Sequence, residues 1–274
     1  MRPPPLSPSM PADGCPLPTM TLKLPPAYRL IERDAVGSSN EEAKTLARAG
    51  AEDGTLLWVR EQAAGKGRGG RAWESPPGNL YISLILRPDC PLGEASALGF
   101  IAALAVGEAI GSVAPPMDVL YKWPNDVLLN GRKVAGILLE SETSGEGLSW
   151  LVLGVGVNVA HFPKDANFPA TSLHFDGAPK TLTVEALLQA FCRYFLSWTN
   201  RWLEEGFAPV RAAWLRHAYR KGEEIEARLP QETLRGRFLD IDESGCLLLL
   251  LPDGSERRIA YGEVFPPDRA GEAG

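Results

Sequence analysis

A glycine-rich cationic segment that runs directly into a β-strand pattern is the feature that most limits the possible folds. Four glycines lie between Gly65 and Gly70, and the alternating apolar run "GNLYISLILRP" follows and stops at Pro88. Glycine loses the most backbone freedom on folding, so such a segment favours a loop whose N–H groups approach an anion closely. The segment lacks the Gly-Lys-Ser/Thr ending of a Walker A loop, and it opens a strand instead of the helix of a dinucleotide-binding loop. Both of those phosphate-binding folds are therefore excluded.

Composition narrows the class of partner. The chain has 274 residues, 45% of them hydrophobic and 23% charged, with a formal net charge of -6. This length suits one large domain with a small appended one. A negative chain argues against nucleic acid as the main partner, because binding phosphate backbones needs a basic face. A local basic cluster in an acidic chain instead indicates a small anionic ligand.

Cysteine and histidine spacing gives no sign of a structural metal or a disulfide framework. Cys15, Cys90, Cys192 and Cys246 lie far apart with no C-x-x-C pair, and the three histidines have no metal-ligand spacing. The N-terminus lacks an apolar signal region, and the longest apolar stretch, Ala95 to Gly107, is too short to cross a bilayer. We expect a soluble, reduced, cytoplasmic protein that does not contact a membrane.

Patterning divides the chain into three regions. Residues 1–26 are proline-rich and non-periodic, which predicts a disordered tail and leaves Met1, Met10 or Met20 as the true start. Residues 27–217 mix helix and strand patterns, which predicts an α+β domain with a mixed sheet. Residues 218–274 contain short β-runs separated by glycine turns, which predicts a small all-β barrel.

Several elements of the middle region can be placed. The stretch "SSNEEAKTLARAG" predicts a capped helix that ends at Gly50, and "EASALGFIAALAVGEAIGSV" predicts one buried helix. A two-residue turn at Asn130-Gly131 predicts a hairpin within "DVLYKWPNDVLLNGRKVAGILLES". Thr183 to about Glu205 predicts an amphipathic helix with an aromatic face.

Two further segments are candidates for chemistry. In "YKWPNDVLLNGRKVAGILLE", Asp126 is suited to orient a magnesium ion or water near a triphosphate, and Lys133 is suited to stabilise charge at an acyl centre. The alternative is a tight turn with a capping aspartate and a solvated lysine. In "GVGVNV", Asn158 is polar within an apolar strand, and its partner is either a turn backbone or a ligand.

The three segments together resemble the motifs of biotin–protein ligases. "GKGRGGRAWESPPGNLYISLILRP", "KWPNDVLLNGRKVAGILLE" and "GVGVNV" are similar to that family in order and spacing, and "GSSN" near Ser38 resembles its Ser-Thr-Asn biotin-contact segment. The C-terminal "GRFLDIDESGCLLLLLPDGSERRIAYGEV" resembles the family's SH3-like barrel. The resemblance covers roughly residues 28–266 and implies a biotin/lipoate ligase-like catalytic domain followed by that barrel.

What the resemblance implies is a two-step ligase. Biotin and ATP, with Mg²⁺, give biotinyl-5′-AMP and pyrophosphate. A lysine of the biotin carboxyl carrier domain of a carboxylase then attacks the anhydride and AMP leaves. Fixed cations and N–H groups in a dry site suit the negative charge that builds up in both steps.

The resemblance also carries roles onto individual positions. For biotin or its activated carboxyl it assigns Ser38, Ser39, Asn40, Gln62, Gly65, Lys66, Gly67, Arg68, Lys133 and Gly136. For ATP it assigns Arg68, Arg71, Trp73, Lys122, Asn125, Asp126 and Asn158. The expected catalytic residues are Lys133, Arg68 and Asp126, with Asp126 also a candidate magnesium ligand.

The sequence departs from the family pattern at two places. Lys66 replaces the first arginine of the glycine loop, keeping the charge but losing the guanidinium fork, and "GSSN" replaces Asp-Ser-Thr-Asn. The resemblance extends to no helix-turn-helix segment, so we expect no DNA binding, and it leaves monomer or homodimer open. The competing classes are a lipoate–protein ligase or octanoyltransferase, and a non-catalytic biotin sensor or regulator.

Overall fold

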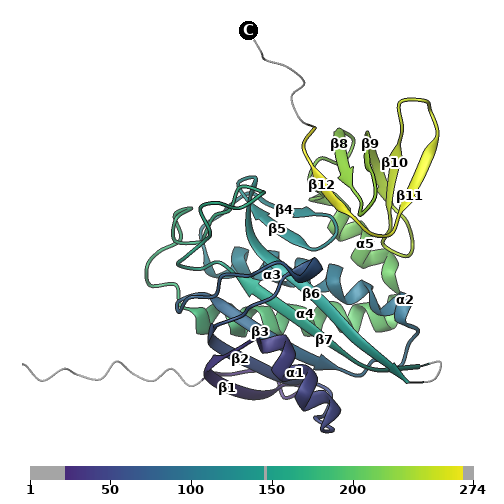
Figure 1. Cartoon of the computed structure of the whole chain (residues 1–274). Helices are drawn as coiled ribbons and strands as arrows, with labels where there is room; N and C mark the ends of the chain where they lie inside the picture. The colour runs from purple at the N-terminus through teal and green to yellow at the C-terminus, as the bar shows by residue number, and fades with distance from the viewer. Residues whose placement is uncertain (1–21, 145–146, 268–274) are drawn as a thin grey trace, which may run out of the picture.

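A seven-stranded sheet forms the centre of the molecule in the computed structural model, which describes residues 22–144 and 147–267 (Figure 1). Its strands are β1 (Arg29–Val36), β2 (Thr55–Gln62), β3 (Leu80–Leu86), β4 (Val119–Lys122), β5 (Asp126–Leu129), β6 (Arg132–Ser144) and β7 (Gly147–Val157). The spatial order is β1-β2-β3-β7-β6-β5-β4. Only β1 and β2 run parallel, and every other neighbouring pair is antiparallel. The mixed α+β architecture predicted from the sequence is confirmed.

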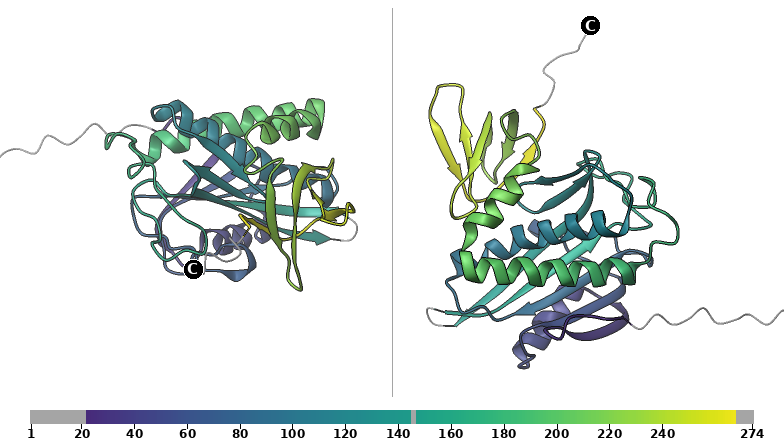
Figure 2. Two further views of the ribbon diagram at one scale, coloured as in Figure 1. Left: turned by 90° about the horizontal axis from the view of Figure 1, so that it is seen from above. Right: turned by 180° about the vertical axis from the view of Figure 1, so that it is seen from behind.

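Helices cover the two faces of this sheet unequally. The helices are α1 (Ser39–Arg48), α2 (Leu92–Ala95), α3 (Ala97–Val113), α4 (Val184–Glu205) and α5 (Phe207–Arg216). Among the described residues, the rear face carries α3 and α4 side by side, and the front face carries α1, over β3 and β7 (Figure 2). The rest of the front face is therefore left for the loops that follow the strands.

The apolar helix α3 is the centre of the main core. It is apolar on all sides, and residues from the sheet, α4 and α5 pack around it. The segment Leu92–Val113 is long and apolar enough to cross a membrane, but 72% of its most apolar window is buried inside the protein, as expected for a core helix. The sequence predicted one continuous helix here. The structure instead separates α2 from α3 at Ser96.

Helix ends follow the predicted signals with one exception. Thr183 caps α4, its hydroxyl accepting a hydrogen bond from the Ala186 N–H at 3.2 Å, and Gly206 ends the helix at φ 75°. Gly50 follows the end of α1 at φ 90°. Ser38 stands at the N-cap of α1, but its side chain makes no capping hydrogen bond. Ser38 instead lines the cavity described below.

The predicted tail extends less far than expected. Its first 21 residues lie outside the described residues, whereas Leu22 and Leu24 already pack against the core. The Lys23 N–H bonds the side chain of Gln189, near the start of α4. Residues 22–24 therefore pack against the seven-stranded sheet and its helices.

A second, five-stranded antiparallel sheet follows α5, as the sequence predicted. Its strands are β8 (Glu224–Arg228), β9 (Thr233–Ile241), β10 (Leu247–Leu250), β11 (Glu256–Ile259) and β12 (Glu263–Phe265), in the order β11-β10-β9-β8-β12. The sheet is attached to the first by specific contacts, since the Trp123 indole N–H donates to the Gly245 carbonyl at 2.9 Å. Its last strand lies beside the open front face of the large sheet (Figure 1).

Candidate active site

A cavity of about 320 Å³ lies on the front face, between the start of α1, the glycine-rich loop, the β4–β5 turn and β12. Its volume is in the range of small-molecule sites. Fifteen of the residues assigned from the sequence line it, and they are Ser38, Ser39, Asn40, Gln62, Lys66, Gly67, Arg68, Arg71, Trp73, Lys122, Asn125, Asp126, Lys133, Gly136 and Asn158. Gly65 does not line it. Its carbonyl instead accepts the Trp73 N–H at 2.9 Å, which closes the base of the loop.

One end of the cavity, here the lysine end, consists of Lys122, Asp126 and Lys133. The Asp126 carboxylate is 2.9 Å from the Lys122 ammonium and 2.5 Å from that of Lys133. The β4–β5 hairpin places Lys122 opposite Asp126. Burial alone would raise the pKa of the Asp126 carboxyl, but Lys133 and Lys122 outweigh burial and hold that pKa well below its usual range. Asp126 is therefore ionised.

The two lysines of this end differ in access. The Lys122 side chain is 2% exposed and lies against the rings of Phe168 and Phe265, at 4.9 and 5.3 Å from their centroids. The Lys133 side chain is 25% exposed. Lys133 is thus the cation that a ligand in the cavity can reach, and Lys122 fixes the carboxylate from behind.

The opposite end, here the serine end, is lined by Ser38, Ser39, Asn40 and Gln62, and Ser83 supports it through contacts with Ser39 and Asn40. The Ser39 N–H donates to the Gln62 side-chain oxygen at 2.7 Å, and the Ser83 hydroxyl lies 2.8 Å from the Ser39 hydroxyl and 2.6 Å from the Asn40 amide oxygen. Four of these side chains are buried or nearly so, with Gln62 half-buried. This end therefore offers fixed neutral donors and acceptors.

Trp73 lies flat on the sheet between the two ends. A Cβ at Gly136 or Gly156 would lie within 2.9 Å of its indole ring, so only glycine permits this position. Gly136, expected to line the floor of a biotin pocket, faces this ring. The Trp73 indole N–H is buried and has no hydrogen-bond partner. An orphaned donor in a cavity wall is satisfied when a ligand brings an acceptor.

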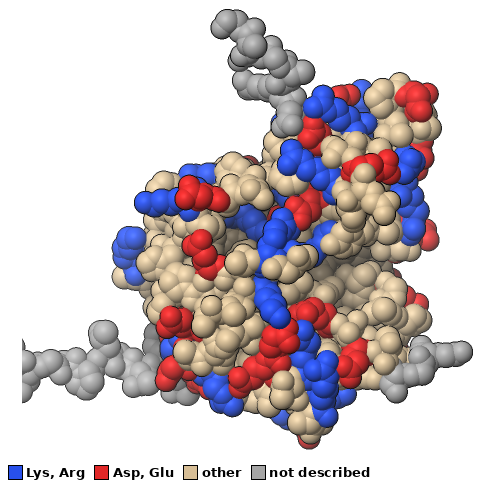
Figure 3. Space-filling model, viewed as in Figure 1, with Lys and Arg blue, Asp and Glu red and all other residues tan. Residues whose placement is uncertain are grey.

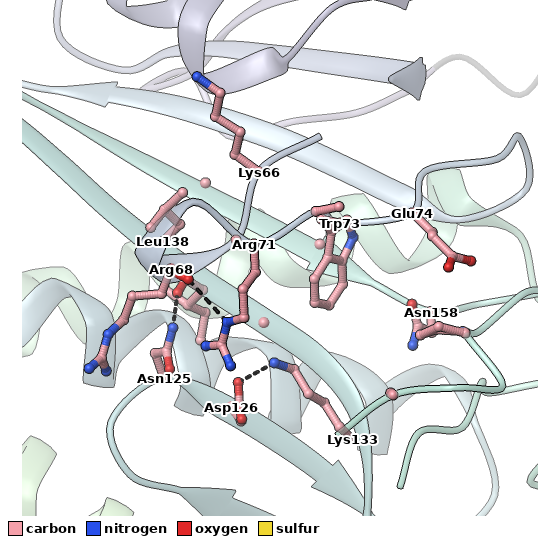
Figure 4. Close-up of a pocket in the computed structure, with 18 of the residues that line it drawn as sticks. Lys66, Arg68, Arg71, Trp73, Glu74, Asn125, Asp126, Lys133, Leu138 and Asn158 are labelled. Carbon is pink, nitrogen blue, oxygen red and sulfur yellow. Dashed lines mark hydrogen bonds and ion pairs between the residues drawn. The ribbon is translucent and has the colours of Figure 1, made fainter. Parts of the chain in front are cut away.

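The three cations of the glycine-rich loop point in different directions (Figure 4). Lys66 points away from the sheet toward α1, where its ammonium lies 2.7 Å from the Glu41 carboxylate. Hydrogen bonds from Lys44 and Lys66 lower the pKa of Glu41 to about 2. Lys66, which replaces the usual arginine, therefore holds the loop to α1.

Arg68 and Arg71 contact the C-terminal sheet. The Arg68 guanidinium donates to the Gly262 carbonyl at 2.8 Å and lies 4.2 Å from the centroid of the Tyr261 ring. Arg71 forms a two-pronged ion pair with Glu263. Both arginines line the cavity, but both are engaged by the protein itself. Figure 3 shows Lys and Arg side chains gathered at the centre of this face.

Asn158 and Asn125 have backbone partners. The Asn158 amide donates to the Thr171 carbonyl at 3.0 Å, and the Asn125 amide donates to the Ile137 carbonyl at 2.6 Å. Of the two alternatives that the sequence left open for Asn158, the backbone partner is present. Both residues still line the cavity.

Sequence reasoning missed the cavity residues that come from distant segments. Phe168 lies in the long connection after β7, and Glu263 and Phe265 lie on β12. Glu263 is 192 residues from its partner Arg71. Nothing local in the sequence signals such a pairing, although the "YGEV" ending of the barrel motif marked the segment as part of the resemblance.

The candidate magnesium site at Asp126 does not fit a resident ion. Both carboxylate oxygens of Asp126 are paired with lysines. Among the described residues, no group of three or more His, Cys, Asp or Glu side chains is placed to hold a metal. A cation at Asp126 would have to displace two ammonium groups, so the site suits an anion next to Lys133 better than a metal.

Comparison with known proteins agrees with this geometry. Residues 24–216 match the biotin/lipoate A/B protein ligase family, and residues 222–265 match the biotin protein ligase C-terminal domain. A biotin–[acetyl-CoA-carboxylase] ligase of Paracoccus denitrificans is 42% identical over 234 residues, which is 83% of this chain and 96% of that protein. The bifunctional ligase/repressor BirA of Bacillus spizizenii is 35% identical over 233 residues, 83% of this chain and 71% of that protein.

A solved structure gives the same result. The biotin protein ligase from Aquifex aeolicus in complex with biotin and ATP superposes with a TM-score of 0.73 at 28% identity, covering 86% of this chain and 97% of that one. The chain therefore belongs to the biotin/lipoate A/B protein ligase family. Within that family, the resemblance to biotin–protein ligases predicted from the sequence is confirmed.

Proposed function

We propose that this chain attaches biotin to a lysine of a carrier domain in two steps, using ATP. In the first step, a carboxylate oxygen of biotin attacks the α-phosphorus of ATP, pyrophosphate leaves, and biotinyl-5′-AMP forms. In the second step, the neutral amine of the carrier lysine attacks the acyl carbon, AMP leaves with the bonding electron pair, and the amine loses a proton. The carboxylate needs no base, because it is ionised near neutral pH.

The observation that carries this proposal is the meeting of three separate motifs at one cavity. The glycine-rich loop, the KWPND turn with Lys133, and the GVGVN strand all line it. The cavity offers neutral hydrogen-bonding groups at the serine end and an accessible cation at the lysine end. A ligand with a neutral polar head and a carboxylate tail fits this division, with the nucleotide beyond the carboxylate.

We assign Lys133 to charge stabilisation at the reacting carboxyl and phosphate. Its ammonium is held by Asp126 at 2.5 Å and lies 5.3 Å from the centroid of the Trp73 ring, so its position is fixed before the reaction. A preorganised cation stabilises a transition state more than a mobile one does. Trp73 offers its ring face, and its unpaired indole N–H, to the activated ligand.

The glycine-rich loop is proposed to protect the adenylate from water. Lys66 joins the loop to α1, Arg71 joins it to Glu263 of β12, and Arg68 joins it to Gly262 just before β12, so the loop is attached on two sides of the cavity. Exclusion of water would keep the mixed anhydride intact until the carrier lysine arrives. Positioning and fixed charge then supply most of the catalysis.

Several finer features belong to the same proposal. Magnesium accompanies the triphosphate of ATP and is not held by a resident protein site. The partner is the biotin carboxyl carrier domain of a carboxylase. No DNA partner is proposed, which the net charge of -6 supports, and the cytoplasm is the proposed compartment.

The test is a transfer assay with the purified full chain, ATP, magnesium and a carrier domain, followed by mass spectrometry of the carrier. We expect labelling with biotin and none with lipoate under the same conditions. Labelling with lipoate alone would replace the proposal with a lipoate ligase. Biotin binding without adenylate formation would replace it with a non-catalytic biotin sensor.

A further inference from the structure

A continuous line of hydrogen bonds leads from the serine end to a carboxylate outside the cavity. The Asn40 amide nitrogen donates to Glu140 at 2.8 Å, and the Asn40 amide oxygen accepts from the Ser83 hydroxyl at 2.6 Å. Ser83 in turn lies 2.8 Å from the Ser39 hydroxyl. Ser39 lines the cavity, whereas Glu140 does not. Glu140 therefore contacts the cavity lining at Asn40, and Ser83 extends this line of hydrogen bonds to Ser39.

The direction of every bond in this line follows from Glu140. An ionised carboxylate only accepts hydrogen bonds, so the Asn40 NH₂ group must face it and the Asn40 oxygen must face Ser83. The Ser83 hydroxyl has one proton, which goes to that oxygen. The contact between Ser83 and Ser39 is then a hydrogen bond only if Ser39 donates. The Ser39 oxygen is left to the cavity as an acceptor.

The opposite arrangement is excluded by the same chemistry. If the Asn40 amide were reversed, its oxygen would face the Glu140 carboxylate, which is repulsive. Ser83 would then accept from Asn40 and donate to Ser39, and Ser39 would present a donor to the cavity. Gly154 leaves room for the Asn40 amide, because a Cβ there would lie 2.3 Å from the amide oxygen. The hydrogen bonds along Asn40, Ser83 and Ser39 can therefore run in either of two directions, and the Glu140 carboxylate selects the one that leaves Ser39 as an acceptor.

Lys44 holds the Glu140 carboxylate in place. The Lys44 ammonium lies 2.8 Å from its second oxygen, and the Lys44 side chain is only 14% exposed. Lys44 also pairs with Glu41 at 2.8 Å, so α1 carries both the lysine and the asparagine that contact Glu140. The carboxylate therefore faces Asn40 with one oxygen and Lys44 with the other.

We propose that Glu140 is a positioning residue that fixes the Ser39 hydroxyl as a hydrogen-bond acceptor, so that the serine end selects a ligand head group with an N–H donor. This proposal rests on the proposed function, in which the head group is the ureido ring of biotin. A site built around a buried acceptor rejects an analogue that lacks the donor, because the acceptor is then left unpaired. Glu140 acts on specificity without touching the ligand.

The experiment measures calorimetric dissociation constants of the full chain for biotin and for two cyclic carbamate analogues, each with one ureido N–H replaced by oxygen. The wild type is expected to bind one of the two analogues about tenfold more weakly than biotin. Glu140→Gln lets a glutamine NH₂ face a reversed Asn40. The Glu140→Gln variant is expected to bind biotin about tenfold more weakly than the wild type does. Its affinities for biotin and for the weaker carbamate are expected to differ by less than about threefold.

Two further variants keep the test decisive. Ser83→Ala leaves Glu140 and Asn40 intact but frees Ser39 to rotate, so it is expected to lose the same discrimination. Glu142→Gln is the matched control, because Glu142 lies on the same strand and pairs with Arg48 at 2.8 Å outside the cavity. It is expected to behave as the wild type. Melting temperatures establish that each variant is folded.

The outcomes separate the two proposals. If the wild type binds no biotin, the proposed function itself fails. If the wild type binds biotin but treats both carbamates equally, Ser39 is not the acceptor and the inference fails alone. Undiminished discrimination in folded Glu140→Gln, or in Ser83→Ala, would also overturn the role of Glu140.

Discussion

The two ends of the cavity are held together by different interactions, hydrogen bonds at the serine end and ion pairs at the lysine end. The serine end is held by hydrogen bonds among neutral groups of α1, β2 and β3, with one carboxylate behind them. The lysine end brings together three charges from three neighbouring strands, β4, β5 and β6, and Phe265 from the other sheet packs against Lys122. The first end is built within one domain, and the second requires both.

The two ends therefore differ in whether their side chains must change partners when a ligand binds. At the serine end, Ser39, Asn40, Gln62 and Ser83 already have hydrogen-bond partners within the protein. Above the lysine end, Arg71 is bound to Glu263, so it has to exchange a carboxylate for a phosphate before it can serve the nucleotide. We therefore expect variants of the serine end to change ligand selection, and variants of the lysine end to change stability, rate and nucleotide affinity.

Asp126→Asn should produce the largest effect, a loss of folding stability that arises at the lysine end. The substitution leaves the 2% exposed Lys122 without its carboxylate, and breaking a buried ion pair in this way costs about 3–5 kcal/mol. The free energy of unfolding from urea titration measures the loss. Asp34→Asn, at a fully exposed aspartate with only a 3.8 Å contact to Arg60, is the control and should be neutral.

The same variant has a defined pH dependence. Because the pKa of Asp126 is depressed in the folded protein, its contribution is complete above the pKa of an unfolded aspartate and is lost as pH falls toward the folded value. The stability difference between wild type and Asp126→Asn should shrink as pH falls below about 4. A difference that is constant with pH would show that the carboxylate charge is not the stabilising feature.

Lys133→Ala should slow adenylate formation by roughly 10²–10³, the effect of losing one preorganised donor. Single-turnover release of pyrophosphate measures this rate. Biotin should still bind through the serine end, although its carboxylate loses the contact with Lys133. Lys180→Ala, at an exposed lysine outside the cavity, is the control. An unchanged single-turnover rate in Lys133→Ala would remove Lys133 from the role assigned to it.

Glu263→Gln tests whether Arg71 must leave Glu263 before it can contact the nucleotide, while the serine end stays unchanged. Loss of the carboxylate frees Arg71, so the KM for ATP should fall about threefold while the KM for biotin stays the same. Steady-state kinetics with each substrate varied in turn measures the split. A higher KM for ATP would show that Glu263 positions Arg71 for the nucleotide and does not compete with it.

Glu263 also shows where sequence reasoning reaches its limit. The glycine loop, the KWPND turn and the GVGVN strand were found because each is a local motif, and the structure places them at one cavity as expected. Contacts such as Arg71 with Glu263, or Lys122 with Phe265, join two sheets and depend on how the sheets pack. A motif states which groups are present, but the packing of separate elements decides which of them are already paired.

The same limit applies to fold details. Periodicity predicted α4, the hairpin at Asn130-Gly131 and the second sheet, because each has strong local signals. The break at Ser96 was missed because α2 and α3 share one apolar pattern. Glu140 was missed for another reason. A glutamate near the end of an apolar strand is ordinary, and only its contact with Asn40 gives it significance.

Glu41→Gln should have the smallest effect, and it tests the attachment of the glycine loop beside the serine end. The Glu41 carboxylate holds Lys66 at 2.7 Å and Lys44 at 2.8 Å, but its side chain is 44% exposed, so solvent weakens both pairs. We expect faster hydrogen exchange in the loop by a few-fold, a modestly shorter adenylate lifetime, and unchanged global unfolding. Glu42→Gln, on the same helix and paired with Arg33, is the matched control.

The pKa of Glu41 is lowered to about 2, so its carboxylate is ionised at neutral pH and holds the loop there. Protection of the loop in the wild type should therefore fall between about pH 4.5 and 2, whereas the variant should show no such step. Equal exchange in wild type and variant would mean that the arginine contacts with β12 hold the loop without help from Lys66.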